Sequence, residues 1–374
     1  MSFATLAITS LACTTAAPPR RATARAVVAR AVVAPPPRAI TPVVAPAPTP
    51  DLSSGCSQSC AIRADRSVWC WGSAVANAPL APRRVEGLDD AQRLACGAWH
   101  CCALRSNDAV SCWRIPSSAE PEATAPAAIE LGEVTQLASG GDTTCALLRS
   151  GEVSCWQLHA FSRANTYTSP RTVRSVEGAR QIAVGASHAC ALQGDGTVRC
   201  WGHNDEGQLG PAAPRHRRRV FDPVTVTGVP RAEEVAVGER HSCARTTEGE
   251  VWCWGSNANG QSGIGPYAGT PEPLRVQGVM GALGLSAGAW HTCVVLGDRS
   301  VECWGNNRTN AVGEIRPAIA SSPVPVPGID RALRVSPSCD ATCALRDDGT
   351  VRCWGARYAS ATSPRGRPMS VSLP

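Results

Sequence analysis

The sequence contains no lysine, few aromatic residues, and no apolar run long enough to cross a bilayer as a helix. Without lysine there is no Gly-Lys loop of the kind that holds nucleotide phosphates, and the G-x-S-x-G and H-E-x-x-H motifs are missing as well. We therefore expect no catalytic activity, no cofactor and no metal. Long segments with a helical period are also absent, whereas glycine and proline are frequent (34 and 30 residues), which predicts an all-β fold.

Cysteine, in contrast, is frequent, with 19 residues. Seven times, a cysteine is followed ten residues later by a second cysteine and then a tryptophan. The pairs are Cys60 and Cys70, Cys102 and Cys112, Cys145 and Cys155, Cys190 and Cys200, Cys243 and Cys253, Cys293 and Cys303, and Cys343 and Cys353. The tryptophans that follow, from Trp71 to Trp354, are 42 to 53 residues apart. A period of this length indicates an array of small units that pack on their neighbours.

Each cysteine pair predicts a β-hairpin. In the fourth unit, Cys190 and Cys200 lie on two alternating strands around the turn Gly194-Asp195-Gly196, so we expect them to face each other. Opposed residues on neighbouring strands come close enough for a disulfide, and regular pairing is typical of an oxidising compartment. Unbonded cysteines in the core are the alternative. Zinc is a weaker one, because the short Cys-x2-Cys spacing is missing.

The third residue of each hairpin turn should adopt a left-handed conformation, which glycine does without steric cost. Glycine occupies this place in four units, and the other three should have less regular turns. The residues are Gly151, Gly196, Gly249 and Gly349 in the first group, and Arg66, Asp108 and Arg299 in the second.

Four histidines occupy one equivalent position, two residues before a hairpin cysteine: His100, His188, His241 and His291. A ring of histidines near an axis could bind a metal, but Gln58, Thr143 and Ala341 fill this position in the other units. A repeated structural hydrogen bond is therefore the better interpretation. The preceding residue varies strongly, which is typical either of a face specialised for a partner or of drift at loop positions. The candidate binding residues are Trp99, Asp142, Arg240, Trp290 and Asp340.

The fullest unit extends from Pro170 to Gly210. It contains P-x-x-V, the apolar strand I-A-V-G at residues 182–185, the hairpin, and then W-G-x-N followed by G-Q-L-G. This pattern resembles the regulator of chromosome condensation repeat family, whose units end in W-G-x-N-x-x-G-Q-L-G and build a seven-bladed β-propeller. The resemblance covers about residues 51–374 and is weaker in units such as the third, where Trp156 is followed by Gln157.

The resemblance also implies a closed ring of seven blades. The first unit begins almost at its cysteine hairpin, whereas the chain ends in R-P-M-S-V-S-L at residues 367–373, which matches the P-x-x-V strand. We therefore expect the C-terminal strand to supply the strand that the first blade lacks and to close the ring.

Five cysteines lie outside the seven pairs: Cys13, Cys56, Cys96, Cys101 and Cys339. Cys56 and Cys339 each lie four residues before a hairpin cysteine, in the first and last units, which a closed ring makes neighbours. The equivalent residues elsewhere are mostly small, as expected for a crowded place near the axis. We therefore predict a Cys56–Cys339 disulfide that locks the ring, whereas the pairing of Cys96 and Cys101 stays open.

Residues 1–17 resemble a signal or lipoprotein segment, because the apolar run Phe3–Ala12 precedes Cys13, a candidate lipidation site. A basic residue before the run is missing, and a disordered N-terminus is the alternative. Residues 18–50 are rich in proline and alanine and predict a disordered linker, which carries five of the six net positive charges. Residues 51–374 form the predicted propeller. A second basic cluster, R-H-R-R-R at residues 215–219, is interpreted as a solvated loop.

These observations predict an exported, cell-envelope or extracellular protein, with Cys13 as a candidate lipid anchor, that binds another protein and does not catalyse a reaction. A second hypothesis is an extracellular enzyme that acts on polysaccharide, for which Asp142 and Asp340 suggest a carboxylate pair. A third, implied by the resemblance, is a regulator of the guanine-nucleotide-exchange type, and a purely structural envelope protein is a fourth. We expect a monomer. We expect no nucleic acid partner, because the folded part is almost neutral.

Overall fold

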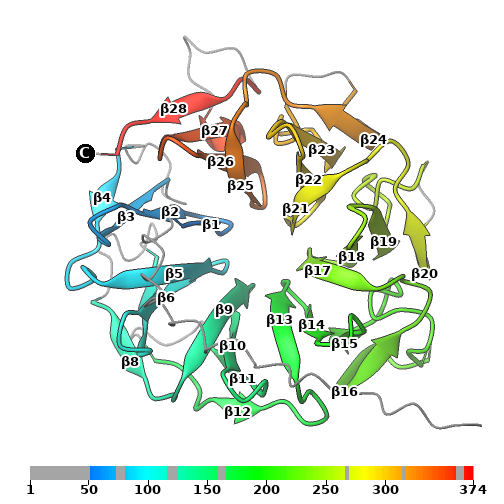
Figure 1. The fold of residues 1–374 in the computed structure, drawn as a ribbon, viewed down its shortest axis with the longest axis horizontal. Helices are drawn as coiled ribbons and strands as arrows, with labels where there is room; N and C mark the ends of the chain where they lie inside the picture. Colours follow the sequence, from blue (N-terminus) through cyan, green and yellow to red (C-terminus); the bar gives the residue numbers. More distant parts are fainter. Residues whose placement is uncertain are drawn as a thin grey trace, which may run out of the picture. The chain divides into compact units, whose positions relative to one another are not determined.

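Each cysteine–tryptophan unit forms one blade, a four-stranded antiparallel sheet, and seven blades stand in a ring (Figure 1). The structure, a computed structural model, describes residues 51–72, 81–115, 125–158, 166–214, 216–265, 269–313, 317–358 and 366–373. The predicted all-β fold and its seven blades are confirmed. The predicted signal segment, the linker and Cys13 lie outside the described residues.

In every blade the first strand lines the central channel and the fourth lies at the rim. Blade 1 contains β1 (Leu52–Ser54), β2 (Ser59–Ile62), β3 (Val68–Trp71) and β4 (Arg83–Arg84). Blade 2 contains β5 (Ala91–Cys96), β6 (His100–Arg105), β7 (Val110–Arg114) and β8 (Ala127–Ile129). Blade 3 contains β9 (Val134–Gly140), β10 (Thr143–Leu148), β11 (Val153–Gln157) and β12 (Arg171–Thr172).

The remaining four blades follow the same order. Blade 4 contains β13 (Ala179–Val184), β14 (His188–Gln193), β15 (Val198–His203) and β16 (Arg219–Val226). Blade 5 contains β17 (Ala232–Val237), β18 (His241–Thr246), β19 (Val251–Gly255) and β20 (Thr270–Arg275). Blade 6 contains β21 (Ala282–Ala287), β22 (His291–Leu296), β23 (Val301–Asn306) and β24 (Ile319–Pro325). Blade 7 contains β25 (Ala332–Pro337), β26 (Ala341–Arg346), β27 (Val351–Gly355), the short 3₁₀ helix η1 (Ala356–Tyr358) and β28 (Met369–Val371).

The hairpin between the second and third strands has the register expected from the sequence. Cys190 is paired directly with Cys200, and the same register recurs in all seven blades. A disulfide joins the two cysteines in each hairpin, with Cα atoms 4.0 to 4.1 Å apart. Each blade is therefore cross-linked through its two middle strands.

The seven hairpin disulfides join the same cysteines that the ten-residue spacing pairs. In each, a cysteine of the second strand is bonded to one of the third strand. In chain order, Cys60 is bonded to Cys70, Cys102 to Cys112, Cys145 to Cys155, Cys190 to Cys200, Cys243 to Cys253, Cys293 to Cys303, and Cys343 to Cys353. Thirteen of these fourteen side chains are fully buried, and Cys155 is the exception. The bonds therefore lie mainly in the core of the ring, where they stabilise the blades.

The seven hairpin turns are equally regular, which corrects one expectation. Arg66, Asp108 and Arg299 adopt the left-handed conformation (φ of 67°, 62° and 67°) at the place that glycine occupies in the other blades. Their amides donate the same turn hydrogen bond as the glycines do, for example from Arg66 to the carbonyl of Arg63 at 2.9 Å. The geometry of the hairpin outweighs the modest steric cost of a side chain at positive φ.

The core lies between neighbouring blades. The second strand of a blade is buried on both faces, so residues such as Ala191, which alternate with the cysteines, are as inaccessible as the cysteines themselves. Small side chains at this alternate position allow the next blade to approach closely. Six of the seven tryptophans that follow a cysteine pair are at most 2% exposed, and they fill the space between the blades.

The C-terminal strand completes the seventh blade rather than the first, so the predicted closure is wrong. In β28, Met369 pairs with Cys353 of β27, whereas the first blade forms its own inner strand from residues 52–54. The P-x-x-V segment is the outer strand of the blade that precedes it, not the opening of the next. The sequence L-S-S did not predict the inner strand of blade 1, because it is short and mostly polar and because the neighbouring blades bury this strand.

Side chains close the ring between blades 7 and 1. A disulfide joins Cys56 to Cys339, with Cα atoms 4.8 Å apart, and Arg334 forms an ion pair with the buried Asp51. Tyr358 of η1 accepts a hydrogen bond from Trp71 Nε1 at 3.1 Å. We call this set of contacts the seam.

Candidate binding face around the channel mouth

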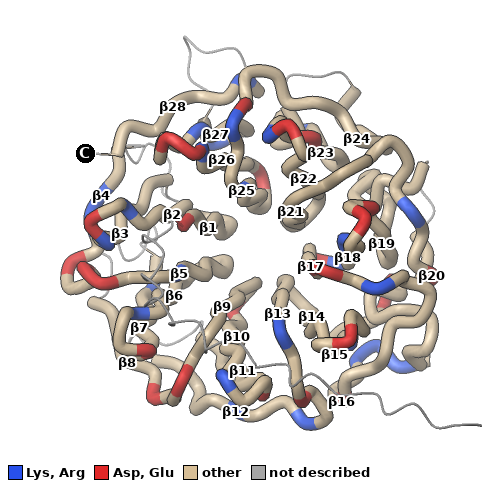
Figure 2. Tube along the Cα trace, viewed as in Figure 1, with Lys and Arg blue, Asp and Glu red and all other residues tan. Residues whose placement is uncertain are grey.

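The inner strands of all blades end around one opening of the central channel, which we call the mouth. A small cavity of about 120 Å³ lies there, and its walls are mainly glycine, alanine and serine. Figure 2 shows mostly uncharged residues at the inner ends of the blades. The position four residues before each hairpin cysteine borders this cavity in every blade, as expected from the small residues in the sequence: Cys56, Ala98, Gly141, Ala186, Glu239, Ala289 and Cys339.

Neighbouring blades touch through their backbones at the mouth. The amide of Ala98 donates a hydrogen bond to the carbonyl of Gly141 at 2.7 Å, across the interface between blades 2 and 3. A Cβ atom on Gly185 would overlap the carbonyl oxygen of Gly238 in the next blade. Glycine is therefore required here by the closeness of the blades, and the mouth is a rigid, narrow rim.

The five candidate binding residues lie in equivalent turns, between the first and second strands of their blades, beside the mouth. We call this surface the mouth face. Trp99 is 43% exposed, and Arg240 is exposed while it forms an ion pair with Glu206 at 3.5 Å. Trp290 is half-buried. The mouth face thus carries two tryptophans and an arginine on a rigid ring, an arrangement suited to contact with a macromolecule.

The two aspartates do not form a carboxylate pair. Asp142 belongs to blade 3 and Asp340 to blade 7, which are not neighbours in the ring. Asp340 forms an ion pair with Arg357, which also donates a hydrogen bond to the carbonyl of Cys56 across the seam. Burial raises the pKa of Asp142, and the charge of Arg114 opposes this shift. Asp340 therefore helps to hold the seam, a role that the sequence alone did not suggest because Arg357 takes the place of the asparagine in the W-G-x-N signature.

The four histidines connect neighbouring blades, which confirms their structural role. Nε2 of His188 lies 2.8 Å from Ser242 Oγ, and Nε2 of His241 lies 2.8 Å from Thr292 Oγ1. His100 and His291 reach Thr144 (2.6 Å) and Thr342 (2.7 Å) in the same way. Blade 1 has Gln58 in place of the histidine, and the hydroxyl position of blade 2 is occupied by Cys101. In the same way, Thr143 of blade 3 corresponds to Ala189 of blade 4.

The hydrogen bonds fix the protonation of these rings. Ser242 Oγ donates to the carbonyl of Gln208 at 3.0 Å and therefore accepts from Nε2 of His188. Nε2 of His188 therefore carries a proton. Burial lowers the pKa to about 3 for His188 and His241 and to about 4 for His100 and His291. Neutral, buried imidazoles of this kind stabilise the contacts between blades and do not transfer protons.

Polar side chains inside the channel are used by the backbone of the next blade. The channel encloses about 450 Å³. Gln136 bonds both backbone groups of Ile182, with its Oε1 2.9 Å from the amide and its Nε2 3.0 Å from the carbonyl. Glu234 Oε2 accepts from the amide of Leu285 at 3.0 Å, and burial raises its pKa although Arg245 opposes this. These groups hold the inner strands together, and we assign them no catalytic role.

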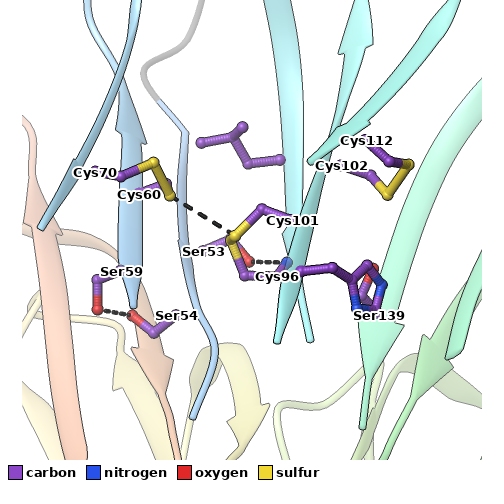
Figure 3. Close-up of a disulfide and its surroundings, with 12 residues drawn as sticks. Ser53, Ser54, Ser59, Cys60, Cys70, Cys96, Cys101, Cys102, Cys112 and Ser139 are labelled. Atoms are coloured by element: carbon purple, nitrogen blue, oxygen red, sulfur yellow. Dashed lines mark hydrogen bonds between the residues drawn. A yellow bond between two sulfur atoms is a disulfide. The ribbon is translucent and has the colours of Figure 1, made fainter. Parts of the chain in front are cut away.

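Cys96 and Cys101, which the sequence left unassigned, form a ninth disulfide (Figure 3). They are paired at the end of the first hairpin of blade 2, where Ser54 and Ser59 occupy the same places in blade 1 and bond at 3.0 Å. Aligning the blades would have found this pair. The Sγ atoms of Cys60, Cys96 and Cys101 lie within 4.8 Å of one another, but all three belong to disulfides, so they offer no thiolate to a metal unless reduced.

Comparison with protein families finds the same repeat. A family model described as regulator of chromosome condensation (RCC1) repeat matches residues 134–156, 179–208 and 233–261, and a second model with this description matches residues 195–245 and 248–295. This chain is similar to RCC1-repeat propellers. The matched residues fall in blades 3 to 6, and the signature after the tryptophan is kept best in blades 4 and 5. Among curated proteins, no sequence matches the chain.

Solved structures share the fold at low identity. Prp20p from Saccharomyces cerevisiae superposes with a TM-score of 0.68 at 20% identity, covering 82% of this chain and 86% of that one. Human WBSCR16 gives 0.65 at 19% identity, covering 79% and 84%. The CRINKLY WD40 ectodomain of the receptor kinase ACR4 from Arabidopsis thaliana gives 0.50 at 21% identity, covering 87% and 98%. Among the described residues, no helix has the length and hydropathy needed to span a membrane.

Proposed function

We propose that this propeller is a binding protein that recognises another protein through its mouth face and has no catalytic activity of its own. The observation that carries this proposal is the presence of Trp99, Arg240 and Trp290 at one equivalent position of a rigid ring, with Trp99 43% exposed. Large side chains on a fixed scaffold bind with little loss of conformational entropy. RCC1-like propellers of known structure support it: yeast RCC1 (Prp20) has been solved bound to Kap60, and Prp20p is described with its binding to Gsp1p and histones.

The test is capture of partners by the full chain from an extract of the cells that make it, followed by mass spectrometry. Replacement of both Trp99 and Trp290 by alanine should abolish the capture of a specific protein. Trp252→Ala is the matched control, because Trp252 lies on the hairpin between β18 and β19, at the opposite end of its blade, and bonds Glu250 through Nε1 at 3.2 Å. Equal capture by the wild type and the double variant would refute a role for the mouth face.

We also propose that the protein is exported and works in the cell envelope or outside the cell. Nine disulfides on one chain support this, because such bonds persist in oxidising compartments. A lipid anchor at Cys13 would hold it at a membrane surface. Cys13→Ser should then move the protein from the detergent phase to the aqueous phase in a partitioning experiment, and an intact Met1 on the native protein would contradict this route.

A further inference from the structure

The interface between blades 3 and 4 differs from every other interface of the ring. Trp201 of blade 4 is the one tryptophan of the repeat that stays partly exposed, whereas its six equivalents are at most 2% exposed. Cys155 of blade 3 is likewise the one hairpin cysteine of the fourteen that is not fully buried. Both side chains border a groove of about 770 Å³ between the two blades.

In blades 4 and 5, the loop after the tryptophan covers the tryptophan of the next blade. In blade 4 the loop with G-Q-L-G reaches over blade 5, where the carbonyl of Gln208 accepts a hydrogen bond from Trp254 Nε1 at 2.9 Å. In blade 5, Gly263 packs so closely on Trp304 that a Cβ would overlap the indole. In blade 3, the sequence between Trp156 and Pro170 contains no G-Q-x-G. The histidine and its hydroxyl partner are also missing here, because Thr143 and Ala189 take their places.

The one aromatic residue of this connection that the structure describes faces the other way. Tyr167 packs edge-on against His100 of blade 2, with ring centroids 6.1 Å apart. It therefore packs in the interface between blades 2 and 3.

The groove leads from the mouth to the rim. Gly185 and Ala186 border both the mouth cavity and the groove, so the two are continuous. At the outer end Phe221 of β16 is 73% exposed. Trp201 and Phe221 thus provide two separate apolar contacts along one path, whose inner end lies beside the mouth face.

The groove is positively charged. Arg171, Arg174 and Arg219 border it and are exposed, and no ion pair joins them to an acid within the part of the chain that the structure describes. By contrast, Arg180 on β13 is paired with Glu233 at 3.1 Å. In Figure 2, basic segments lie beside β12 and near the start of β16, at the rim of this interface.

Arg219 is held in place by its stacking partner. Its guanidinium lies 5.0 Å from the centre of the Phe221 ring, which leaves its N–H groups free to bind oxygen atoms. The basic cluster at residues 215–219, interpreted from the sequence as a solvated loop, leads directly into this strand. Arg219, the last residue of the cluster, therefore lies at the groove.

We propose that the groove between blades 3 and 4 binds an extended acidic segment of a protein partner. The carboxylates of the segment pair with the three arginines, and an apolar side chain packs against Trp201. The proposal deepens the proposed function and rests on it, since the segment belongs to the protein that the mouth face recognises. A single-stranded nucleic acid fits less well, because Asp222 lies in the groove and Asp205 lies beside its rim, where they would repel a continuous phosphate backbone.

The test measures binding of synthetic peptides to the full, oxidised chain by fluorescence anisotropy. The probe is a fluorescein-labelled peptide that alternates aspartate with leucine and phenylalanine, and the matched probe carries asparagine in place of aspartate. We expect saturable binding of the acidic probe that weakens at least about tenfold with the asparagine probe and with the Arg171→Glu/Arg219→Glu variant. Arg308→Glu, an exposed arginine in the equivalent loop of blade 6, should bind like the wild type.

Trp201→Ala should weaken binding by a similar factor, and a melting curve shows whether this variant is folded. The charge-reversal variant keeps the test decisive if Trp201→Ala unfolds, because its two substitutions are at exposed positions. Absence of saturable binding, or equal binding by the charge-reversed chain, would overturn the proposal. So would tighter binding of a labelled oligothymidylate with the same dependence on the arginines. If the Trp99/Trp290 variant loses its partner while the peptide does not bind, the groove proposal fails and the proposed function stands.

Discussion

The interface between blades 5 and 6 and the interface between blades 3 and 4 use the same backbone arrangement, yet one is closed and the other is open. In the first, His241 bonds Thr292 and the loop of blade 5 packs on Trp304. In the second, the histidine, the hydroxyl and the G-Q-x-G sequence are all missing, and Trp201 stays partly exposed. The loss of a few side chains between two blades can therefore accompany an open groove without any change of strand.

Omission alone does not open an interface. The seam also lacks the histidine, since Ala341 occupies its position, but Tyr358 reaches Ser59 Oγ at 3.2 Å and seals the gap. Between blades 1 and 2, where Gln58 replaces the histidine, the sulfur of Cys60 lies 3.7 Å from that of Cys101 and fills the space. The interface of blades 3 and 4 is distinctive because no such substitute is found among the described residues.

The largest expected effect concerns the seam. Loss of the Cys56–Cys339 bond removes a constraint on nearly the whole ring, for which the chain-entropy model gives an upper figure of about 5 to 6 kcal/mol in the free energy of unfolding. Cys56→Ala should therefore lower the melting temperature of the oxidised protein substantially. The measurement is thermal unfolding followed by circular dichroism.

The control is the same substitution in a Cys339→Ala background, where it should have little further effect because the bond is already lost. Additive losses from the two substitutions would show that the cysteines act as separate core residues. Cys96→Ala offers a second comparison, since the loop that its disulfide closes is short and the stabilisation correspondingly smaller.

The next effect compares the two tryptophans. Trp254→Ala removes a fully buried indole and its hydrogen bond to Gln208, and should cost about 3 to 5 kcal/mol of stability. Trp201→Ala should cost less than about half of that, because the indole is partly solvated already. Denaturant unfolding of the two variants measures both values. Similar losses would mean that the groove is closed in solution.

The smallest effect is a change in pH dependence. The pKa of buried His291 is lowered to about 4, below its ordinary value of 6.5, so only the unfolded chain takes up a proton as the pH falls through this window. Stability is fully present above pH 6.5 and declines towards pH 4, by about 1.4 kcal/mol per pH unit for each such histidine. His291→Gln should reduce the slope of stability against pH by this amount.

Thr143→Gln at the equivalent position of blade 3 is the matched control, and its slope should equal that of the wild type. An unchanged slope in His291→Gln would contradict a neutral, buried ring. Unfolding midpoints measured at several pH values between 4 and 7 distinguish these outcomes.

The sequence predicted contacts within a hairpin better than contacts between blades. Cys190 and Cys200 are ten residues apart and the spacing recurs seven times, so pairing follows from strand geometry alone. The lock between Cys56 and Cys339 could be inferred because a closed ring makes the first and last units neighbours. The turn at Arg66 could not be, since the backbone of the hairpin overrides the preference of a single side chain.

The repeat pattern of the sequence could not predict contacts that occur only once in the ring. Arg357 and Tyr358 follow the last tryptophan, and nothing in the other units shows that they cross the seam. The sequence did not predict the groove either. A loop motif is absent between Trp156 and Pro170, but only the partial exposure of Trp201 in the structure shows which side chain borders the groove. The assignment of P-x-x-V to the opening of a blade failed because the sequence does not mark where one blade ends.

Because β28 completes its own blade, every blade is one uninterrupted piece of chain, and the cut in the circle falls between two complete blades. Leu52 and Leu373 pack in the same apolar cluster at this cut, so the two ends of the ring lie together. The position of the cut is then topologically arbitrary: the circle could be opened between any other two blades and rejoined at the seam without exchanging a strand. The side chains that hold the seam therefore mark where this chain begins its circuit of the ring.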